Sequence, residues 1–197
     1  MVSMSYLLAI SSSPRRNGNS ELLLNSFGEG AKEAGRRVET VRLNDLRFRP
    51  CQACDRCSST GKCVIKDDMQ NLYPMVETAG GIVLATPIHF GSISAQLKMF
   101  IDRFQCWWHA KYTLKSPFVR LEENRPGFLI CCGALKNKEY CANALQIGKV
   151  FFHNINYSYA GFLCKQGFDL KGSIAENPAN LKEAWQAGFD FGSKKMR

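Results

Sequence analysis

The sequence lacks any run close to the roughly 18 apolar residues that a membrane-spanning helix needs. We also expect no cleavable signal peptide, because the first apolar run leads into the polar segment 11–20. We therefore expect a cytoplasmic protein without a membrane partner. Repeats and low-complexity segments are absent too. The 197 residues suit a single domain, 1–197, since one hydrophobic core usually spans about 100 to 200 residues.

Acidic residues are scarce relative to basic ones: 17 Asp and Glu stand against 26 Lys and Arg, which gives a net charge of +9. Such an excess can indicate nucleic-acid binding. Here the excess is spread along the chain and never forms a basic run with interleaved aromatic residues. We expect no nucleic-acid partner. The charge favours anionic small molecules or acidic protein partners.

Several functional motifs are missing as well. The chain contains neither GxGxxG nor GxxxxGK[ST], so the patterns of dinucleotide-binding and nucleotide-triphosphatase sites give no support to those classes. No Ser/His/Asp or Cys/His catalytic arrangement is visible in the sequence. We assign no catalytic residue.

Short apolar runs alternate with longer amphipathic ones, which is the pattern of a parallel sheet covered by crossover helices. The predicted strands are 6–11, 38–43, 81–86, 128–132 and 155–164. The predicted helices are 20–35, 67–79, 94–108, 139–152 and 180–194. Residues 44–66 are interpreted as a loop insertion. The strict alternation predicts an α/β doubly wound sheet of five parallel strands with helices on both faces. Ligands bind such sheets at the carboxyl ends of the strands.

The segment 11–20 joins a predicted buried strand to a helix and is rich in hydroxyl and amide groups. Together with the free N–H groups of the helix start, these groups can surround an anion with hydrogen-bond donors. We therefore predict a phosphate site, against the alternative of an ordinary Ser/Asn/Gly-rich turn. The candidate binding residues are Ser11, Ser13, Arg15, Asn17, Gly18, Asn19 and Ser20.

The third predicted strand runs into a loop at the same edge. Thr86 and Pro87 can hold an extended turn whose backbone faces a flat heteroaromatic ring, on which His89 or Phe90 can pack. The candidate ring contacts are Thr86, Pro87, Ile88, His89, Phe90 and Gly91, together with Gly133 at the end of the fourth strand. For His89 the alternative is a solvent-facing loop residue. Asp102 and Arg103 are expected to form a helix-end ion pair.

Four of the nine cysteines lie within thirteen residues as Cys51-x2-Cys54-x2-Cys57-x5-Cys63. A 4Fe-4S cluster needs four such thiolates, whereas structural zinc more often uses two CxxC pairs separated by a dozen residues or more. We favour the cluster and keep zinc, idle thiols and disulfides as alternatives. The remaining five lie on apolar elements and are expected to be small buried hydrophobic residues. These are Cys106, Cys131, Cys132, Cys141 and Cys164.

Three segments within residues 6–103 resemble a known family. The segment SSPRRNGNS at 12–20 resembles the FMN phosphate loop of flavodoxin-like NAD(P)H-dependent FMN reductases, with Ser12 in place of the usual Gly. Residues 86–103 resemble the segment that lines the flavin ring there, with His89 in place of the usual Tyr. The cysteine motif, followed by Asp-Asp-Met at 67–69, resembles the iron-sulfur flavoprotein branch.

This resemblance implies a flavodoxin-like sheet with strand order 2-1-3-4-5, FMN and a 4Fe-4S cluster as cofactors, and a homodimer or homotetramer. We therefore predict an FMN-dependent oxidoreductase of the iron-sulfur flavoprotein type. It passes electrons between a reduced donor, NAD(P)H or ferredoxin, and an acceptor. The alternatives are a cluster-free NAD(P)H-dependent FMN or quinone reductase and a non-enzymatic FMN electron carrier.

Overall fold

Five parallel strands form the centre of the fold. They are β1 (Leu7–Ser11), β2 (Val38–Arg42), β3 (Gly81–His89), β5 (Arg125–Gly133) and β6 (Tyr157–Gln166). In the computed structural model, which describes residues 6–194, they pair in the order β2-β1-β3-β5-β6. A sixth strand, β4 (Ser92–Ile93), pairs with β3 alone. Because β4 lies outside the parallel sheet, β5 and β6 are its fourth and fifth strands. The predicted doubly wound sheet and its order 2-1-3-4-5 are therefore confirmed.

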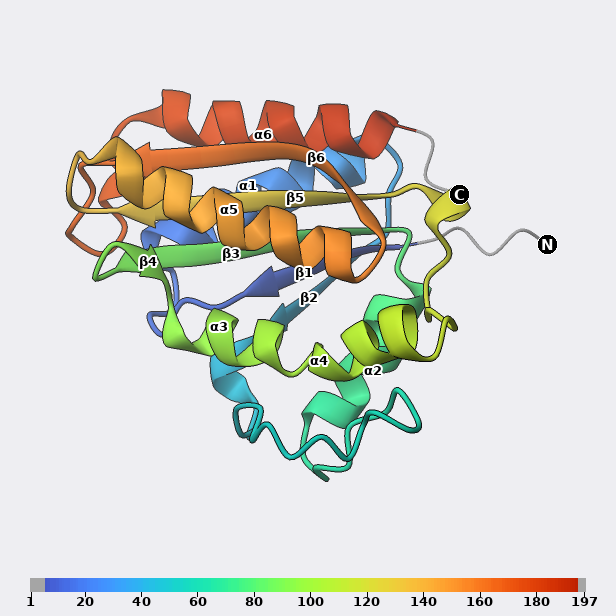
Figure 1. The fold of residues 1–197 in the computed structure, drawn as a ribbon. Coiled ribbons are helices and arrows are strands. Elements are labelled where there is room, and N and C mark those ends of the chain that lie inside the picture. Colours follow the sequence, from blue (N-terminus) through green and yellow to red (C-terminus); the bar gives the residue numbers. More distant parts are fainter. Residues whose placement is uncertain (1–5, 195–197) are drawn as a thin grey trace.

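Helices cover both faces of the sheet (Figure 1). On one face lie α1 (Asn19–Glu33) and α6 (Pro178–Ser193). On the other lie α2 (Met69–Thr78), α3 (Ala95–Asp102), α4 (Gln105–Trp108) and α5 (Lys138–Asn154). Short helical turns span Leu43–Asp45, His109–Thr113, Leu121–Glu123 and Ser173–Glu176. None of the described helices has the length and apolar character that crossing a membrane requires.

The third strand is longer than predicted and turns back on itself. We expected residues 87–93 to form a loop, whereas β3 continues to His89 and returns as the antiparallel strand β4. Phe90 (φ 50°) and Gly91 (φ 74°) both adopt the left-handed backbone conformation that two-residue hairpin turns need. Pro87 still pairs with Cys132 of β5, but β1 ends opposite Ala85, so on that side Pro87 has no neighbouring strand and its missing N–H is tolerated.

The predicted helix 94–108 is interrupted at Arg103. The hydroxyl of Tyr73 and the thiol of Cys106 donate hydrogen bonds to the Arg103 carbonyl, at 2.9 and 3.3 Å. These side chains occupy a carbonyl that would otherwise support the helix, so it ends and restarts as α4. The expected ion pair between Asp102 and Arg103 is also wrong. Asp102 binds Lys98 at 2.7 Å, and the Arg103 side chain turns inward.

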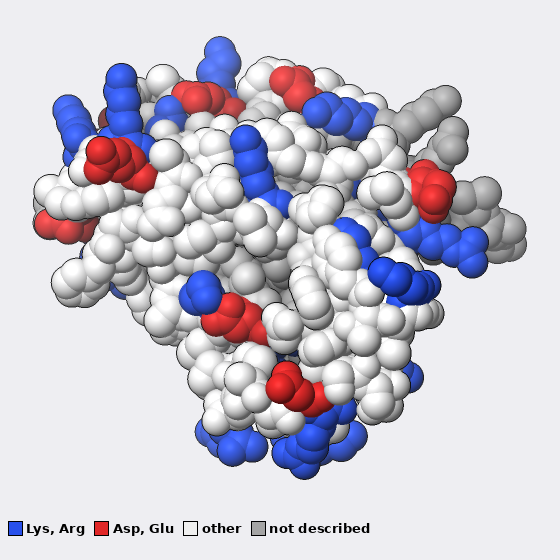
Figure 2. Space-filling model, viewed as in Figure 1, with Lys and Arg blue, Asp and Glu red and all other residues white. Residues whose placement is uncertain are grey.

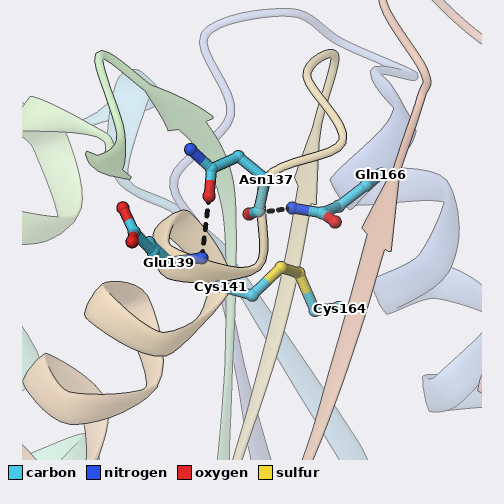
Figure 3. Close-up of a disulfide and its surroundings, with 5 residues drawn as sticks. All are labelled: Asn137, Glu139, Cys141, Cys164 and Gln166. Atoms are coloured by element: carbon cyan, nitrogen blue, oxygen red, sulfur yellow. Dashed lines mark hydrogen bonds between the residues drawn. A yellow bond between two sulfur atoms is a disulfide. The ribbon is translucent and has the colours of Figure 1, made fainter.

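Two of the five isolated cysteines differ from the prediction. Cys106, Cys131 and Cys132 are buried, as expected. Cys141 and Cys164 are half-buried and form a disulfide that joins α5 to β6 (Figure 3). The two residues lie 23 positions apart in the chain, and only the packing of α5 on the sheet brings their side chains together.

Helices α1 and α6 pack with almost no space between their backbones. A Cβ atom on Gly30 would lie 2.0 Å from the Trp185 carbonyl oxygen, and one on Gly188 would lie 1.9 Å from that of Phe27. Real Cβ atoms do not approach so closely. Glycine is therefore required at both positions for this helix pair to cover the sheet.

We predict that Gly188→Ala lowers the free energy of unfolding by about 1–3 kcal/mol, because the new methyl group forces the helices apart. Gly28→Ala is the matched control. It lies in α1, but its Cβ would meet only a Val38 methyl group at 3.7 Å. The free energy of unfolding of Gly28→Ala should stay the same or rise by up to about 1 kcal/mol, because alanine has a higher helix propensity than glycine. Urea denaturation checks both variants, and equal effects would contradict the close packing.

Candidate functional site

A pocket of about 180 Å³ opens at the carboxyl edge of the sheet. Four connections that are distant in the sequence meet there because parallel strands end at the same edge. It is lined by Ser13, Pro14, Arg15, Gly18, Asn19 and Ser20 after β1, Pro87, Ile88 and His89 of β3, Cys132, Gly133 and Ala134 at the end of β5, and Phe168, Asp169 and Lys171 after β6.

The start of α1 presents free hydrogen-bond donors at the lining of this pocket. Gly18 is the N-cap residue, and no side chain caps the helix. The first bond along the helix runs from the Leu22 N–H to the Gly18 carbonyl at 2.9 Å. The preceding N–H groups of the first turn therefore have no carbonyl partner within the helix. Unpaired amides and the positive end of the helix dipole make this position attractive to an anion.

The loop after β1 is held by buried hydroxyl groups. Ser12 uses its N–H and its hydroxyl to donate to the Ala85 carbonyl, both at 2.9 Å. The Ser94 hydroxyl donates to that of Ser12 at 2.9 Å, and the Ser94 N–H donates to the Thr86 hydroxyl at 2.9 Å. These bonds fasten the loop to β3 and to the start of α3. The Ser12 side chain, where the family usually has Gly, is thus fully accommodated.

A second, more apolar pocket of about 370 Å³ adjoins the first. Both share Ile88, His89, Gly133 and Ala134. The second pocket is completed by Phe90, Gly91, Leu135 and Tyr140. A ligand with an anionic end and a flat aromatic end would therefore find donors in one pocket and apolar walls in the next.

The predicted site residues divide between these pockets and their supports. The first pocket contains Ser13, Arg15, Gly18, Asn19, Ser20, Pro87, Ile88, His89 and Gly133, and the second adds Phe90 and Gly91. Three predicted residues line neither pocket. Ser11 is buried in β1, Asn17 is exposed and donates its N–H to the Glu21 carboxylate, and Thr86 is buried against Ser94.

The sequence interpretation missed the segment after β6 and the start of α5. Phe168, Asp169 and Lys171 line the first pocket, and Leu135 and Tyr140 line the second. The Asn19 side-chain amide donates a hydrogen bond to the Leu170 carbonyl at 2.9 Å. This bond joins the segment after β6 to the start of α1. The available signal was topological: the segment follows the last parallel strand and so lies at the same edge.

The four motif cysteines line one cavity below the sheet. Cys51, Cys54, Cys57 and Cys63 surround it together with Arg103 and Cys106. Among residues 6–194 they do not form a group close enough to share a single ion. Because an iron-sulfur cubane is larger than one ion, its ligands can lie further apart. Four thiolates around one cavity are the ligand number that a 4Fe-4S cluster takes.

A buried ion pair anchors the cysteine segment. The Arg103 guanidinium, fully buried, donates to Asp67 at 2.6 and 3.0 Å and to the Arg49 carbonyl at 2.8 Å. Burial opposes ionisation of Asp67, but the bonds from Arg103 and from the Arg49 N–H hold its pKa below the ordinary value. Both ends of the cysteine segment are thereby fixed to the junction of α3 and α4.

The thiols within the segment differ in acidity. Hydrogen bonds from Arg56 hold the pKa of Cys54 below its ordinary value, which favours the thiolate that metals bind. Burial, and then the neighbouring motif cysteines, raises the pKa of Cys57. Burial raises the pKa of Cys106 to about 11, so this fifth thiol stays protonated at neutral pH. Cys106 thus resembles a packed side chain more than a ligand.

Basic side chains gather around this segment. Figure 2 shows Lys and Arg at the lower end of the molecule, where Figure 1 places the chain between β2 and α2. The exposed basic residues of the segment are Arg47, Arg49, Arg56, Lys62 and Lys66. An acidic partner would be attracted to this end.

Comparison with known proteins agrees with these observations. A sequence profile described as NADPH-dependent FMN reductase matches residues 6–151. The chain belongs to this family. It is 40% identical over 97 residues to an iron-sulfur flavoprotein of Methanocaldococcus jannaschii, covering 49% of this chain and 50% of that protein. It is 36% identical over 110 residues to the iron-sulfur flavoprotein of Methanosarcina thermophila, covering 56% and 58%. The matches thus span about half the length of these relatives.

Solved structures show the same fold. An NAD(P)H:quinone oxidoreductase from Methanothermobacter marburgensis superposes with a TM-score of 0.75 at 15% identity, covering 99% of this chain and all of the other. An archaeal flavodoxin superposes with a TM-score of 0.55 at 10% identity, covering 95% and 96%. The expected flavodoxin-like fold is therefore confirmed.

We predict that Asp67→Asn lowers the free energy of unfolding by about 3–5 kcal/mol at pH 7, because it leaves the buried Arg103 charge unpaired. The lowered pKa of Asp67 means that its contribution is complete above the ordinary carboxyl pKa near 4 and is lost as the pH falls through the folded-state value. The difference between variant and parent should therefore shrink below about pH 4.

Asp102→Asn is the matched control, since Asp102 pairs with Lys98 on the surface. Asp102→Asn should lower the free energy of unfolding by less than about 1 kcal/mol at every pH. Denaturant titrations between pH 3 and 8 check both variants. A pH-independent loss in Asp67→Asn would show that the pair does not stabilise through the Asp67 charge.

Proposed function

We propose that the protein is an FMN-dependent oxidoreductase of the iron-sulfur flavoprotein type, with FMN in the two adjoining pockets and a 4Fe-4S cluster at the motif cysteines. The observation that carries the proposal is the uncapped start of α1, which opens onto a pocket that continues into an apolar one. FMN accepts a hydride and releases electrons singly, while the cluster carries one electron at a time.

The first pocket suits the phosphate of FMN. The free amides at Asn19 and Ser20 can donate to its oxygens, and Arg15 and Lys171 supply positive charge at the lining. Asp169 brings one negative charge to the same pocket, and the Arg15 guanidinium donates to its carbonyl at 3.4 Å. The basic groups outnumber it, so a dianionic phosphate is favoured.

The second pocket suits the isoalloxazine ring. The backbone of β3 at Ile88 and His89 and that of β5 at Gly133 and Ala134 border both pockets, so ring and phosphate can be held at once. Tyr140 closes the apolar side and packs closely on Gly91, where a Cβ would lie 3.0 Å from its ring. Direct hydride transfer requires an open ring face more than an acid or base, so His89 is assigned contact only.

The cysteine segment suits the second cofactor. Cys51, Cys54, Cys57 and Cys63 would supply the four thiolates, and the segment that carries them is held by the ion pair of Arg103 with Asp67. NAD(P)H is the proposed donor to the flavin, and ferredoxin is an alternative donor because the exposed basic residues around the motif suit an acidic protein. We further propose a cytoplasmic homodimer or homotetramer.

We predict that Arg15→Glu weakens FMN binding at least tenfold, equivalent to about 1.4 kcal/mol, because it places a negative charge at the phosphate pocket. Arg16→Glu is the matched control. Arg16 is the next residue, is exposed and pairs with Asp45 outside the pocket. It should change the affinity less than twofold. Flavin fluorescence titrations with FMN and with riboflavin check both variants.

Riboflavin lacks the phosphate, so its affinity should be the same in the parent and in both variants. Equal weakening of FMN and riboflavin by Arg15→Glu would place the phosphate elsewhere. Failure of the parent to bind any flavin would overturn the proposed function itself.

We predict that anaerobically purified protein contains four irons and four sulfides per chain, and that Cys54→Ser lowers the iron content while leaving FMN bound. Cys106→Ala is the matched control, because Cys106 lines the same cavity outside the motif. It should retain all four irons. Iron, sulfide and zinc analysis, together with NAD(P)H turnover, checks the assignment.

One zinc ion per chain with turnover retained would instead support a cluster-free reductase. Bound FMN without turnover from any donor would support an electron carrier. Loss of FMN with retention of iron in Cys54→Ser would contradict the division of the two sites.

A further inference from the structure

A second group of cysteines lies apart from the motif. Cys131 of β5, Cys141 of α5 and Cys164 of β6 place their three sulfur atoms within 4.8 Å of one another. Among the residues that the structure describes, no other set of three Cys, His, Asp or Glu side chains comes together in this way. Cys141 and Cys164 are joined as a disulfide in Figure 3. Cys131 is a free, fully buried thiol.

The surrounding backbone holds the three cysteines in place. Cys131 and Cys164 are direct partners in the parallel pairing of β5 and β6. Asn137 caps α5 by accepting the Glu139 N–H at 2.9 Å, and its carbonyl accepts a hydrogen bond from the Gln166 amide (Figure 3). The start of α5, which carries Cys141, is thus tied to the end of β6. The site is built on regular elements rather than on a mobile loop.

The spacing suits one ion. Metal–thiolate bonds of about 2.3 Å place two sulfur atoms on the same ion at most about 4.6 Å apart, so three sulfur atoms that lie within 4.8 Å of one another need only small side-chain shifts to share an ion. The Cα atoms of Cys141 and Cys164 are 6.2 Å apart, so once their bond is broken the two sulfur atoms can separate by side-chain rotation alone. A disulfide needs two cysteines, whereas the buried third thiol supplies a further ligand for a metal.

We propose that, when the Cys141–Cys164 disulfide is reduced, Cys131, Cys141 and Cys164 bind one copper(I) ion. Soft thiolate ligands select copper(I) and zinc, but zinc sites almost always have four ligands, and no fourth His, Cys, Asp or Glu joins this group within residues 6–194. Cys141 and Cys164 are half-buried, so a reductant can reach their disulfide from solvent.

The chemistry balances with a dithiol as reductant. The dithiol gives two electrons and two protons, the S–S bond breaks into two thiols, and the dithiol becomes a disulfide. Copper(I) then forms three Cu–S bonds as up to three thiol protons leave to solvent. No change in the oxidation state of copper is required.

The test compares copper(I) binding by the full chain, reduced with dithiothreitol that is then removed without oxygen, in competition with bicinchoninate. Cys131→Ser, Cys141→Ser and Cys164→Ser should each bind one equivalent less than the parent. Cys132→Ser is the matched control, because Cys132 is the next residue of β5 and packs in the core on the opposite face of the sheet. It should bind as much as the parent. The parent and all variants keep the four motif cysteines, so any copper bound there does not affect the difference in copper content between them.

Protein left oxidised should also bind one equivalent less than reduced protein. Equal binding by the parent and all three variants would overturn the proposal. A loss in Cys141→Ser and Cys164→Ser but not in Cys131→Ser would show a two-thiolate site and would overturn the assignment of Cys131 as a ligand. Uptake of zinc alone, with no copper(I), would overturn the choice of ion. If Cys131→Ser does not fold, because its hydroxyl is buried, Cys131→Ala removes the same thiol without adding a polar group and should also bind one equivalent less.

Discussion

The parallel pairing of the strands is the constraint on which the rest of the structure depends. Because β1, β3, β5 and β6 run in one direction, the connections that follow them meet at one edge. The uncapped first turn of α1 is placed there with its free amides, beside the hairpin of β3 and the end of β5. Neither the donors nor the apolar walls would make a cofactor site alone. Only together, in two adjoining pockets, do they form a site that suits both the phosphate and the ring of a flavin.

The cysteine segment depends on a different interaction. It has almost no regular structure of its own, and it is held by the ion pair of Asp67 with the buried Arg103 and by hydrogen bonds from the Gln70 amide to the carbonyls of Cys63 and Ile65. That pair also coincides with the interruption between α3 and α4, where the Arg103 carbonyl is taken by Tyr73 and Cys106. One residue therefore ends a helix, neutralises a buried carboxylate and lines the cavity of the motif.

Local patterns predicted the sheet, its helices and much of the first pocket, because apolar periodicity and the composition of the loop at 11–20 are properties of short segments. Two exceptions were local, namely the hairpin between β3 and β4 and the pairing of Asp102 with Lys98, and the others were long-range. The break at Arg103 depends on a hydrogen bond from the Tyr73 hydroxyl to the Arg103 carbonyl. The Cys141–Cys164 disulfide forms only because α5 lies on β6. Phe168 and Lys171 reach the pocket only through the return of the chain after the last strand. No sequence window contains both partners of these long-range contacts.

A crystal structure of the protein grown with FMN tests the central claim most directly. We expect electron density for the phosphate at the first-turn amides of α1. The density for the ring should lie between the β3 hairpin and the segment that joins β5 to α5. Density for the phosphate at any other part of the chain, or a ring lying away from His89 and Gly133, would contradict it.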